Sequence, residues 1–243
     1  MTNFLDVENG DNASLQAPGI VIALLTYERT AEALRTIQGV IKNLDYPREL
    51  RTFYIADDGS RPEHIQIILK FLEENQETVC GYHFQSFAQR PACGIGWNKA
   101  VEVGHQFSDI ILWLEDDWEL EHKLDIRPYI RLLLERQEVG MISMRGLTDG
   151  LRTEVATHRG IHYLEILRNC VPGTMAYSGN PLLRHKRYFD YYGMFTIHTS
   201  PGDIEIFYDN RYVRGEPHAP EIWRPAALNE WGCFGHIGRE RTW

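Results

Sequence analysis

The chain has 243 residues, of which 43% are hydrophobic and 24% are charged, and its formal net charge at pH 7 is −9. This length suits one sizeable α/β domain and is short for two domains with separate cores, and the composition excludes a largely disordered or repetitive chain. Residues 1–144 hold 13 basic and 23 acidic residues, and residues 145–243 hold 12 and 11. The acidic first half excludes broad electrostatic wrapping of nucleic acid, because such binding depends on Lys and Arg that neutralise phosphates.

The first segment, residues 1–18, is polar and lacks any periodicity. We expect it to be flexible and to precede a single domain over residues 19–243. The longest apolar runs, residues 19–26 and 110–114, are far shorter than the ~20 residues that cross a bilayer, and no basic segment precedes an apolar run at the start. We therefore expect a cytoplasmic protein (host cytoplasm if viral) without a membrane partner. The four cysteines are widely spaced, which favours buried thiols.

Predicted strands and helices alternate through the first half of the chain. Residues 19–25 form a continuous apolar run typical of a strand buried on both faces, and residues 30–44 have the apolar spacing of a helix that Thr30 would cap. Further strands are expected at residues 51–56, 82–87, 109–114 and 139–144, and further helices at residues 62–75, 96–107 and 126–135. This order predicts an α/β fold with a mostly parallel central sheet flanked by helices.

Polar clusters follow three of these strands, at Thr26–Arg29, Asp57–Ser60 and Glu115–Trp118. Ligands of such sheets bind at the carboxyl ends of the strands, so we expect the clusters to form one site. The run Glu115, Asp116 and Asp117 is the strongest signal, because adjacent carboxylates repel each other unless a cation or strong donors offset them. Hard oxygen ligands suit Mg²⁺ or Mn²⁺ shared with a substrate's phosphates. A solvated acidic turn is the alternative.

Two more segments point to a nucleotide. Asp57 and Asp58 stand in a sequence that is common in turns. Because this turn is expected to lie beside Thr26–Arg29, one of its carboxylates can accept a hydrogen bond from the imide N–H of uracil. Arg29 can bind ribose or phosphate. Gly94–Ala100 enters a helix with glycines that let the backbone approach a ligand. The segment lacks the Walker lysine-serine pair, and no Gly-rich turn follows the first strand, which excludes a P-loop NTPase and an NAD dehydrogenase.

Taken together, the motifs resemble the large inverting family-two-like glycosyltransferases of the GT-A fold, some of which are phage-related. The matching segments are Leu24–Arg29 (LLTYER), Ile55–Ser60 (IADDGS), Gly94–Ala100 (GIGWNKA) and Leu114–Trp118 (LEDDW). They cover about the first half of the chain and are far more specific as a set than singly. The resemblance implies a Rossmann-like GT-A domain in which residues 19–144 bind a nucleotide-sugar and residues 145–243 form an irregular half that binds the acceptor.

The resemblance also implies roles for individual positions. Asp117 would bind the metal, Mn²⁺ or Mg²⁺, together with His236, which lies between two glycines near the C-terminus. Glu115 departs from the family's pattern and is the least secure of the acidic triplet. The residues implied to bind the nucleotide-sugar are Thr26, Tyr27, Arg29, Asp57, Asp58, Arg90, Gly96, Asn98, Glu115, Asp116 and Arg239.

An inverting transfer needs a base that removes the acceptor hydroxyl's proton. Residues 202–205 resemble the family's glycine-acid segment in layout, and we nominate Asp203 as the base, followed by Glu205. The alternative for Asp203 is that it caps a helix expected at residues 204–208.

The sequence thus predicts a metal-dependent hexosyltransferase that moves a sugar from a nucleotide-sugar, a UDP-sugar first of all, to an acceptor hydroxyl with inversion. One alternative acceptor is a hydroxymethylated pyrimidine in DNA, for which the basic stretches 184–187 and 211–214 would bind phosphates. The aromatics expected to stack on an extruded base are Tyr188, Tyr191, Tyr192 and Trp223. A catalytically silent sugar-nucleotide binding module is the alternative of another class. A nucleotidyltransferase is disfavoured, since its Gly-rich basic signature after the first strand is missing.

Overall fold

A computed structural model describes residues 17–79, 81–87, 93–146, 151–169, 176–177, 181–196, 200–216, 218–226 and 232–238. The elements of its first half are β1 (Ile20–Thr26), α1 (Thr30–Asn43), β2 (Leu44–Asp45), a short 3₁₀ turn (Arg48–Leu50), β3 (Arg51–Asp57), α2 (Pro62–Glu74), α3 (Gln76–Val79), β4 (Tyr82–Ser86), α4 (Cys93–Phe107), β5 (Ile110–Glu115), β6 (Trp118–Leu120), β7 (Leu124–Asp125), α5 (Arg127–Glu135) and β8 (Val139–Ser143). There follow β9 (Thr153–His158), β10 (Ile161–Ile166), β11 (Leu182–His185), α6 (Lys186–Tyr192), α7 (Pro201–Val213), β12 (Glu221–Pro225) and β13 (Phe234–His236).

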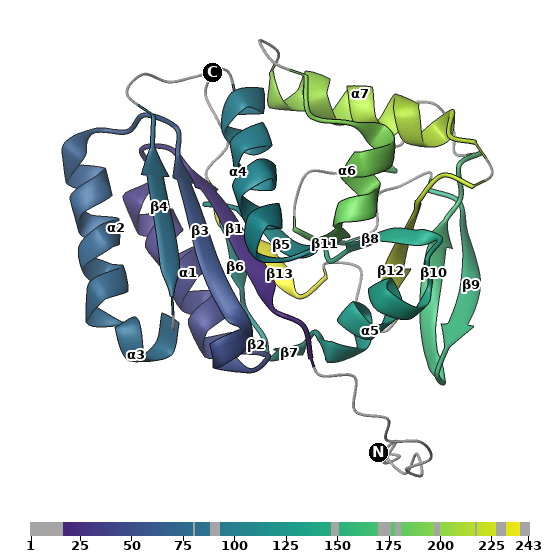
Figure 1. Cartoon of the computed structure of the whole chain (residues 1–243), viewed down its shortest axis with the longest axis horizontal. Helices are drawn as coiled ribbons and strands as arrows, with labels where there is room; N and C mark the ends of the chain where they lie inside the picture. Colours follow the sequence, from purple (N-terminus) through teal and green to yellow (C-terminus); the bar gives the residue numbers. More distant parts are fainter. Residues whose placement is uncertain are drawn as a thin grey trace.

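One nine-stranded sheet combines strands from both predicted halves, in the order β4-β3-β1-β5-β11-β8-β12-β10-β9 (Figure 1). The strands β4, β3, β1 and β5 are parallel, as the alternating pattern predicts. β11 then pairs antiparallel with both β5 and β8, while β8 and β12 are parallel. The α/β fold is therefore confirmed, with a mixed sheet in which the parallel part carries the expected strand ends.

Helices cover both faces of the sheet. α1, α2 and α5 pack on one face, which we call the α1 face, through residues such as Ile37 and Ile68. α4, α6 and α7 pack on the other, the α4 face, through residues such as Trp97 and Tyr208, and Figure 1 shows these three helices together. Successive side chains of a strand point to opposite faces, so Leu114 of β5 lies in the core on the α1 face. At the ends of the strands, neighbouring side chains point to opposite faces for the same reason.

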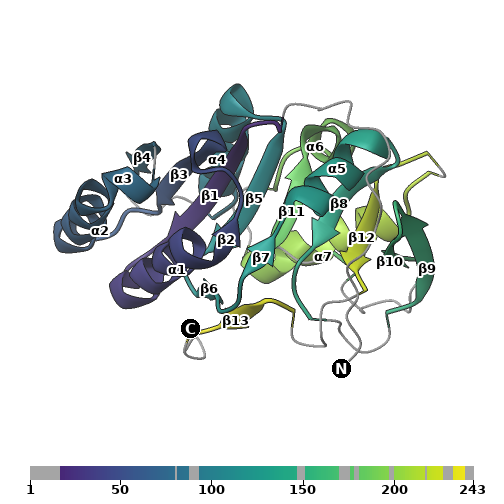
Figure 2. The ribbon, with the colours of Figure 1, turned by 90° about the horizontal axis from the view of Figure 1, so that it is seen from below.

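The C-terminal strand β13 returns to the end of β5. It pairs antiparallel with β6, with His236 opposite Trp118, and Figure 2 shows the two strands next to α1. This pairing brings a histidine from the end of the chain close to the acidic segment that follows β5.

The predicted helices and strands of the first half agree closely with those observed, but the predicted cap is wrong. Arg29 is the residue before α1 and makes no side-chain cap bond, whereas the Thr30 hydroxyl lies 2.8 Å from His64 Nδ1 of α2. Cys233 is a buried thiol, as predicted, and Cys80 and Cys170 lie outside the described residues. None of the helices in the described ranges combines the length and hydropathy of a membrane span.

We predict that Gly39→Ala destabilises the protein although alanine favours helices over glycine by about 1 kcal/mol. A Cβ at Gly39 would lie 3.0 Å from the backbone nitrogen and oxygen of Leu120, so α1 would have to move away from β6. Overpacking of this kind costs about 1–3 kcal/mol, and the expected net loss is about 1 kcal/mol in urea unfolding. Gln38→Ala, at the exposed neighbouring position, should be neutral or slightly stabilising. Equal effects of the two substitutions would contradict this packing argument.

Candidate active site

Three strands of the parallel part of the sheet end side by side. β1 pairs with β3 so that Thr26 lies opposite Asp57, and with β5 so that Leu25 lies opposite Glu115. The polar segments that follow these strands therefore meet at one edge of the sheet.

A buried network on the α1 face orients Asp116. The Thr26 hydroxyl donates to Asp116 Oδ2 at 3.1 Å, and the backbone N–H of Tyr27 donates to the same oxygen at 3.0 Å. Thr26 Oγ1 also lies 3.0 Å from His64 Nε2. Since the hydroxyl gives its only proton to Asp116, His64 Nε2 must donate, and its Nδ1 accepts from Thr30. Thr26 thus holds Asp116 in place from a buried position.

Sequence reasoning missed His64. It lies on the buried side of α2 with Ile68 and Leu72, at four-residue spacing, and this position in an apolar stripe was the available signal. Burial lowers the pKa of His64, and the charges of Asp57 and Glu28 oppose that shift.

We predict that His64 lowers the free energy of unfolding as the pH falls. Its pKa is lower in the folded state than the unfolded value of 6.5, so below that value the unfolded chain binds a proton that the native state does not. The stability of the wild type minus that of His64→Gln should therefore fall as the pH drops below about 6.5, by at most about 1.4 kcal/mol per pH unit. Urea unfolding at several pH values measures the difference, in which contributions of the other histidines cancel. Parallel curves for the two proteins would contradict the assignment.

Asp116 and Asp117 are both buried, with 4% and 3% of their surface exposed. Burial raises the pKa of Asp116 to about 7; the Tyr27 N–H opposes the rise, and the charge of Asp117 adds to it. The Arg29 guanidinium lies between the two carboxylates. Its Nη1 donates to Asp117 Oδ2 and lies 3.5 Å from Asp116 Oδ1.

His236 reaches the same aspartate. Its Nε2 lies 3.3 Å from Asp117 Oδ2, the imidazole is half-exposed, and the backbone N–H of Ile237 donates to the Asp117 carbonyl at 2.8 Å. Within the described ranges no group of three or more His, Cys, Asp and Glu side chains forms a complete metal site. Asp117 Oδ1, however, is buried and accepts no hydrogen bond from a described residue. A carboxylate oxygen and an imidazole nitrogen suit a divalent ion that takes its remaining ligands from a substrate.

The two candidate base-reading aspartates differ in their surroundings. Asp57 is fully buried and holds its own turn, accepting from the backbone N–H groups of Gly59 and Ser60 at 3.2 and 3.1 Å and from the Ser86 hydroxyl at 2.6 Å. Asp58 is part-buried, and a Cβ at Gly96 would lie 3.4 Å from its Oδ1. Asp58 and the start of α4 are thus neighbours.

Asn98 has a structural partner. Its Nδ2 donates to the Phe195 carbonyl at 2.9 Å, and its Oδ1 accepts from the Phe195 N–H at 2.7 Å. This reciprocal pair anchors the segment that follows α6 onto α4. Arg90 and Arg239 lie outside the described residues.

The candidate bases also occupy different environments. Asp203 is exposed and forms a capping box with Ser200, whose N–H and hydroxyl both donate to its carboxylate, at 3.2 and 2.7 Å. Glu205 is part-buried. Burial raises the pKa of Tyr177 to about 12; the Arg184 charge opposes the rise, and the charges of Glu205 and Glu115 add to it. Glu205 and Glu115 are thus within electrostatic range of one phenol.

The expected base-stacking aromatics are mostly wrong. Tyr188, Tyr192 and Trp223 are core residues with at most 2% of their surface exposed, because α6 and β12 turn them inward. Only Tyr191 of the predicted set is accessible, at 39%. It lines an open groove of about 580 Å³. The other residues lining that groove include Phe207, Arg211 and Arg214.

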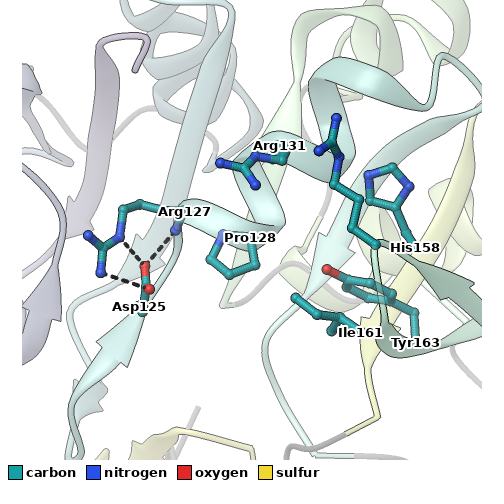
Figure 3. A pocket seen from close by; sticks show the side chains of 8 residues that line it. Asp125, Arg127, Pro128, Arg131, His158, Ile161 and Tyr163 are labelled. Carbon is teal, nitrogen blue, oxygen red and sulfur yellow. Dashed lines mark hydrogen bonds and ion pairs between the residues drawn. The ribbon is translucent and has the colours of Figure 1, made fainter. Parts of the chain in front are cut away.

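A second pocket, of about 340 Å³, contains none of the nominated residues (Figure 3). Arg127 and Arg159 line it, and they bond to Asp125 and to Glu135, respectively. Because carboxylates already offset these two positive charges, the pocket offers neither of them to a phosphate and lies outside the candidate site.

No protein-family model and no curated protein matches the sequence. Solved structures do match the fold. The mannosyltransferase PcManGT from Pyrobaculum calidifontis, in complex with GDP-Man and Mn²⁺, has a TM-score of 0.54 at 13% identity, over 77% of this chain and 50% of its own. S. aureus TarS 1-349 in complex with UDP-GlcNAc has 0.63 at 13%, over 92% and 60%. GalNAc-T7 with UDP, GalNAc and Mn²⁺ has 0.64 at 13%, over 94% and 45%. The chain thus has the GT-A fold of these glycosyltransferases and spans about half to three-fifths of their length.

Proposed function

We propose that this protein is a metal-dependent glycosyltransferase that moves a sugar from a UDP-sugar to an acceptor hydroxyl with inversion. The observation that carries the proposal is the meeting of Asp116, Asp117 and His236 at the carboxyl ends of the parallel strands. Solved proteins of this fold bind GDP-Man, UDP-GlcNAc or UDP, and two of them hold Mn²⁺. Fold likeness and local chemistry thus support the same reaction.

Asp117 and His236 would hold Mn²⁺ or Mg²⁺. When bound, such an ion supplies positive charge that stabilises the leaving nucleoside diphosphate. Thr26 and Tyr27 fix the Asp116 carboxylate, which adds a second acidic group beside Asp117. Asp58, beside the start of α4, is proposed to accept the imide N–H of uracil, because it is part-buried where Asp57 is fully buried.

Glu205 is proposed as the base in preference to Asp203, because its charge acts on the same phenol as that of Glu115, whereas Asp203 is exposed at the start of α7. In the reaction the acceptor oxygen bonds to the anomeric carbon as the bond from that carbon to the diphosphate breaks. The hydroxyl proton passes to the Glu205 carboxylate.

The open groove beside α6 and α7 is proposed to bind a part of the acceptor away from the reacting hydroxyl, because its lining residues Phe207, Arg211 and Arg214 lie on another face of α7 than Glu205. Tyr191 and Phe207 offer ring faces, and Arg211 and Arg214 offer positive charge. Rings and guanidinium groups suit a sugar-bearing acceptor and also a base with its phosphates, which keeps modified DNA as the second candidate acceptor. A gel shift with hydroxymethylated DNA that weakens steeply with salt would favour DNA, since a neutral saccharide shows little such dependence.

Thermal unfolding with a panel of nucleotide-sugars, each with and without Mn²⁺, tests the function. A donor that binds only the native state, at a concentration of 100 times its Kd, stabilises the native state by about 2.7 kcal/mol. The best donor is then incubated with the protein and Mn²⁺, and release of the nucleoside diphosphate is measured. Binding without release would favour a silent binding module, and the absence of both would defeat the proposal.

A further inference from the structure

Arg29 forms an ion pair with Asp117, the proposed metal ligand. Its Nη1 is bonded to Asp117 Oδ2, the oxygen that also lies 3.3 Å from His236 Nε2. Burial lowers the pKa of Arg29, but the bond to Asp117 and the charges of both aspartates raise it further, so the net shift is upward. A permanent positive charge therefore offsets two buried carboxylates.

The position of Arg29 is enclosed. A Cβ at Gly238 would lie 2.6 Å from Asp117 Oδ2 and 3.1 Å from Arg29 Nη1, so the chain after β13 closes over the ion pair. Only 21% of the Arg29 side chain is exposed. Because Oδ2 is the Asp117 oxygen next to His236 Nε2, an ion held by both residues would displace the guanidinium from it.

Displacing Arg29 has an energetic consequence. A guanidinium removed from its carboxylates in a partly buried position is strongly unfavourable unless another anion accepts it. The diphosphate of a donor is such an anion and suits arginine, which forms paired hydrogen bonds with phosphate oxygens. Release of Arg29 by the metal and its capture by the diphosphate would then favour each other.

We propose that Arg29 is a resident counter-cation that couples metal binding to nucleotide binding. Without a nucleotide, it competes with the metal for Asp117. With a nucleotide, it transfers to the diphosphate, so each ligand strengthens the binding of the other by the same factor. The proposal rests on the function proposed above.

The test measures Mn²⁺ affinity from the electron paramagnetic resonance signal of free Mn²⁺, with and without UDP and corrected for the Mn²⁺–UDP complex in solution. In the wild type, UDP should raise the affinity about tenfold or more. Arg29→Met should bind Mn²⁺ alone about tenfold more tightly than the wild type, and UDP should raise that affinity by a smaller factor than in the wild type, because only the direct attraction between the ion and the diphosphate would remain. Arg29→Lys keeps the charge and should retain the weak binding of the wild type.

Arg35→Met is the matched control, because Arg35 lies in α1, the helix that follows Arg29, and pairs with Glu119 instead. It should behave as the wild type does. Arg29→Gln, which can still donate to Asp117, replaces Arg29→Met if circular dichroism shows that the latter does not fold. Equal Mn²⁺ affinity and equal UDP dependence in the wild type and the neutral Arg29 variants would overturn the coupling alone. If no folded protein in the series binds Mn²⁺ or UDP, the proposed function fails with it.

Discussion

Asp117→Asn should abolish sugar transfer while the fold stays intact. The substitution removes the negative charge from a metal ligand and keeps its shape, and the amide oxygen can still accept a bond from Arg29. A divalent ion at a leaving diphosphate contributes several kcal/mol, and about 4 kcal/mol corresponds to a loss of about 10³-fold in rate. Release of the nucleoside diphosphate at saturating donor and Mn²⁺ measures the effect.

Asp125→Asn is the matched control for this experiment. Asp125 is exposed and pairs with Arg127 in the second pocket, away from the acidic site. It should leave both transfer and Mn²⁺ binding unchanged. Transfer by folded Asp117→Asn at a rate near that of the wild type would remove Asp117 from the metal site and with it the central contact of the proposed function.

The parallel part of the fold was predictable because its signals are local. The apolar run at β1 and the helical period of α1 each identify their element without reference to the rest of the chain. The insertion of β11 between β5 and β8 was not predictable in this way. Its four residues, Leu182–His185, carry too short a pattern, and their place in the sheet depends on pairing with strands about 40 to 70 residues earlier.

The position of the site in the sheet was predictable from the sequence, whereas most contacts between its side chains were not. Strand ends located the carboxylates. The two-residue period of β3 separates Asp57 from Asp58, because Asp57 continues the side of Phe53 and Ile55, which lies on the α1 face. The ion pair of Arg29 with Asp117 could not be read from the sequence, since 88 residues separate the partners. The arrangement of Asp117 with His236 likewise depends on the pairing of β13 with β6.

Glu205→Gln should lower kcat by about 10²- to 10⁴-fold, the usual contribution of a general base, with little change in Mn²⁺ affinity. Asp203→Asn should instead retain most of the activity and lose about 1 kcal/mol of stability, because its carboxylate closes the capping box at the start of α7. The two substitutions each neutralise one acid in the same helix and lie two residues apart. Steady-state kinetics and urea unfolding of both variants separate a catalytic role from a structural one.

Ser200→Ala provides the comparison for the cap. It removes the other side chain of the capping box, so its loss of stability should match that of Asp203→Asn, and its kcat should stay near that of the wild type. A catalytic Asp203 would give a different pattern, with kcat lost in Asp203→Asn but kept in Ser200→Ala and Glu205→Gln. In that event the exposed carboxylate would have to leave its cap to take the acceptor proton, and the choice of Glu205 as the base would be wrong.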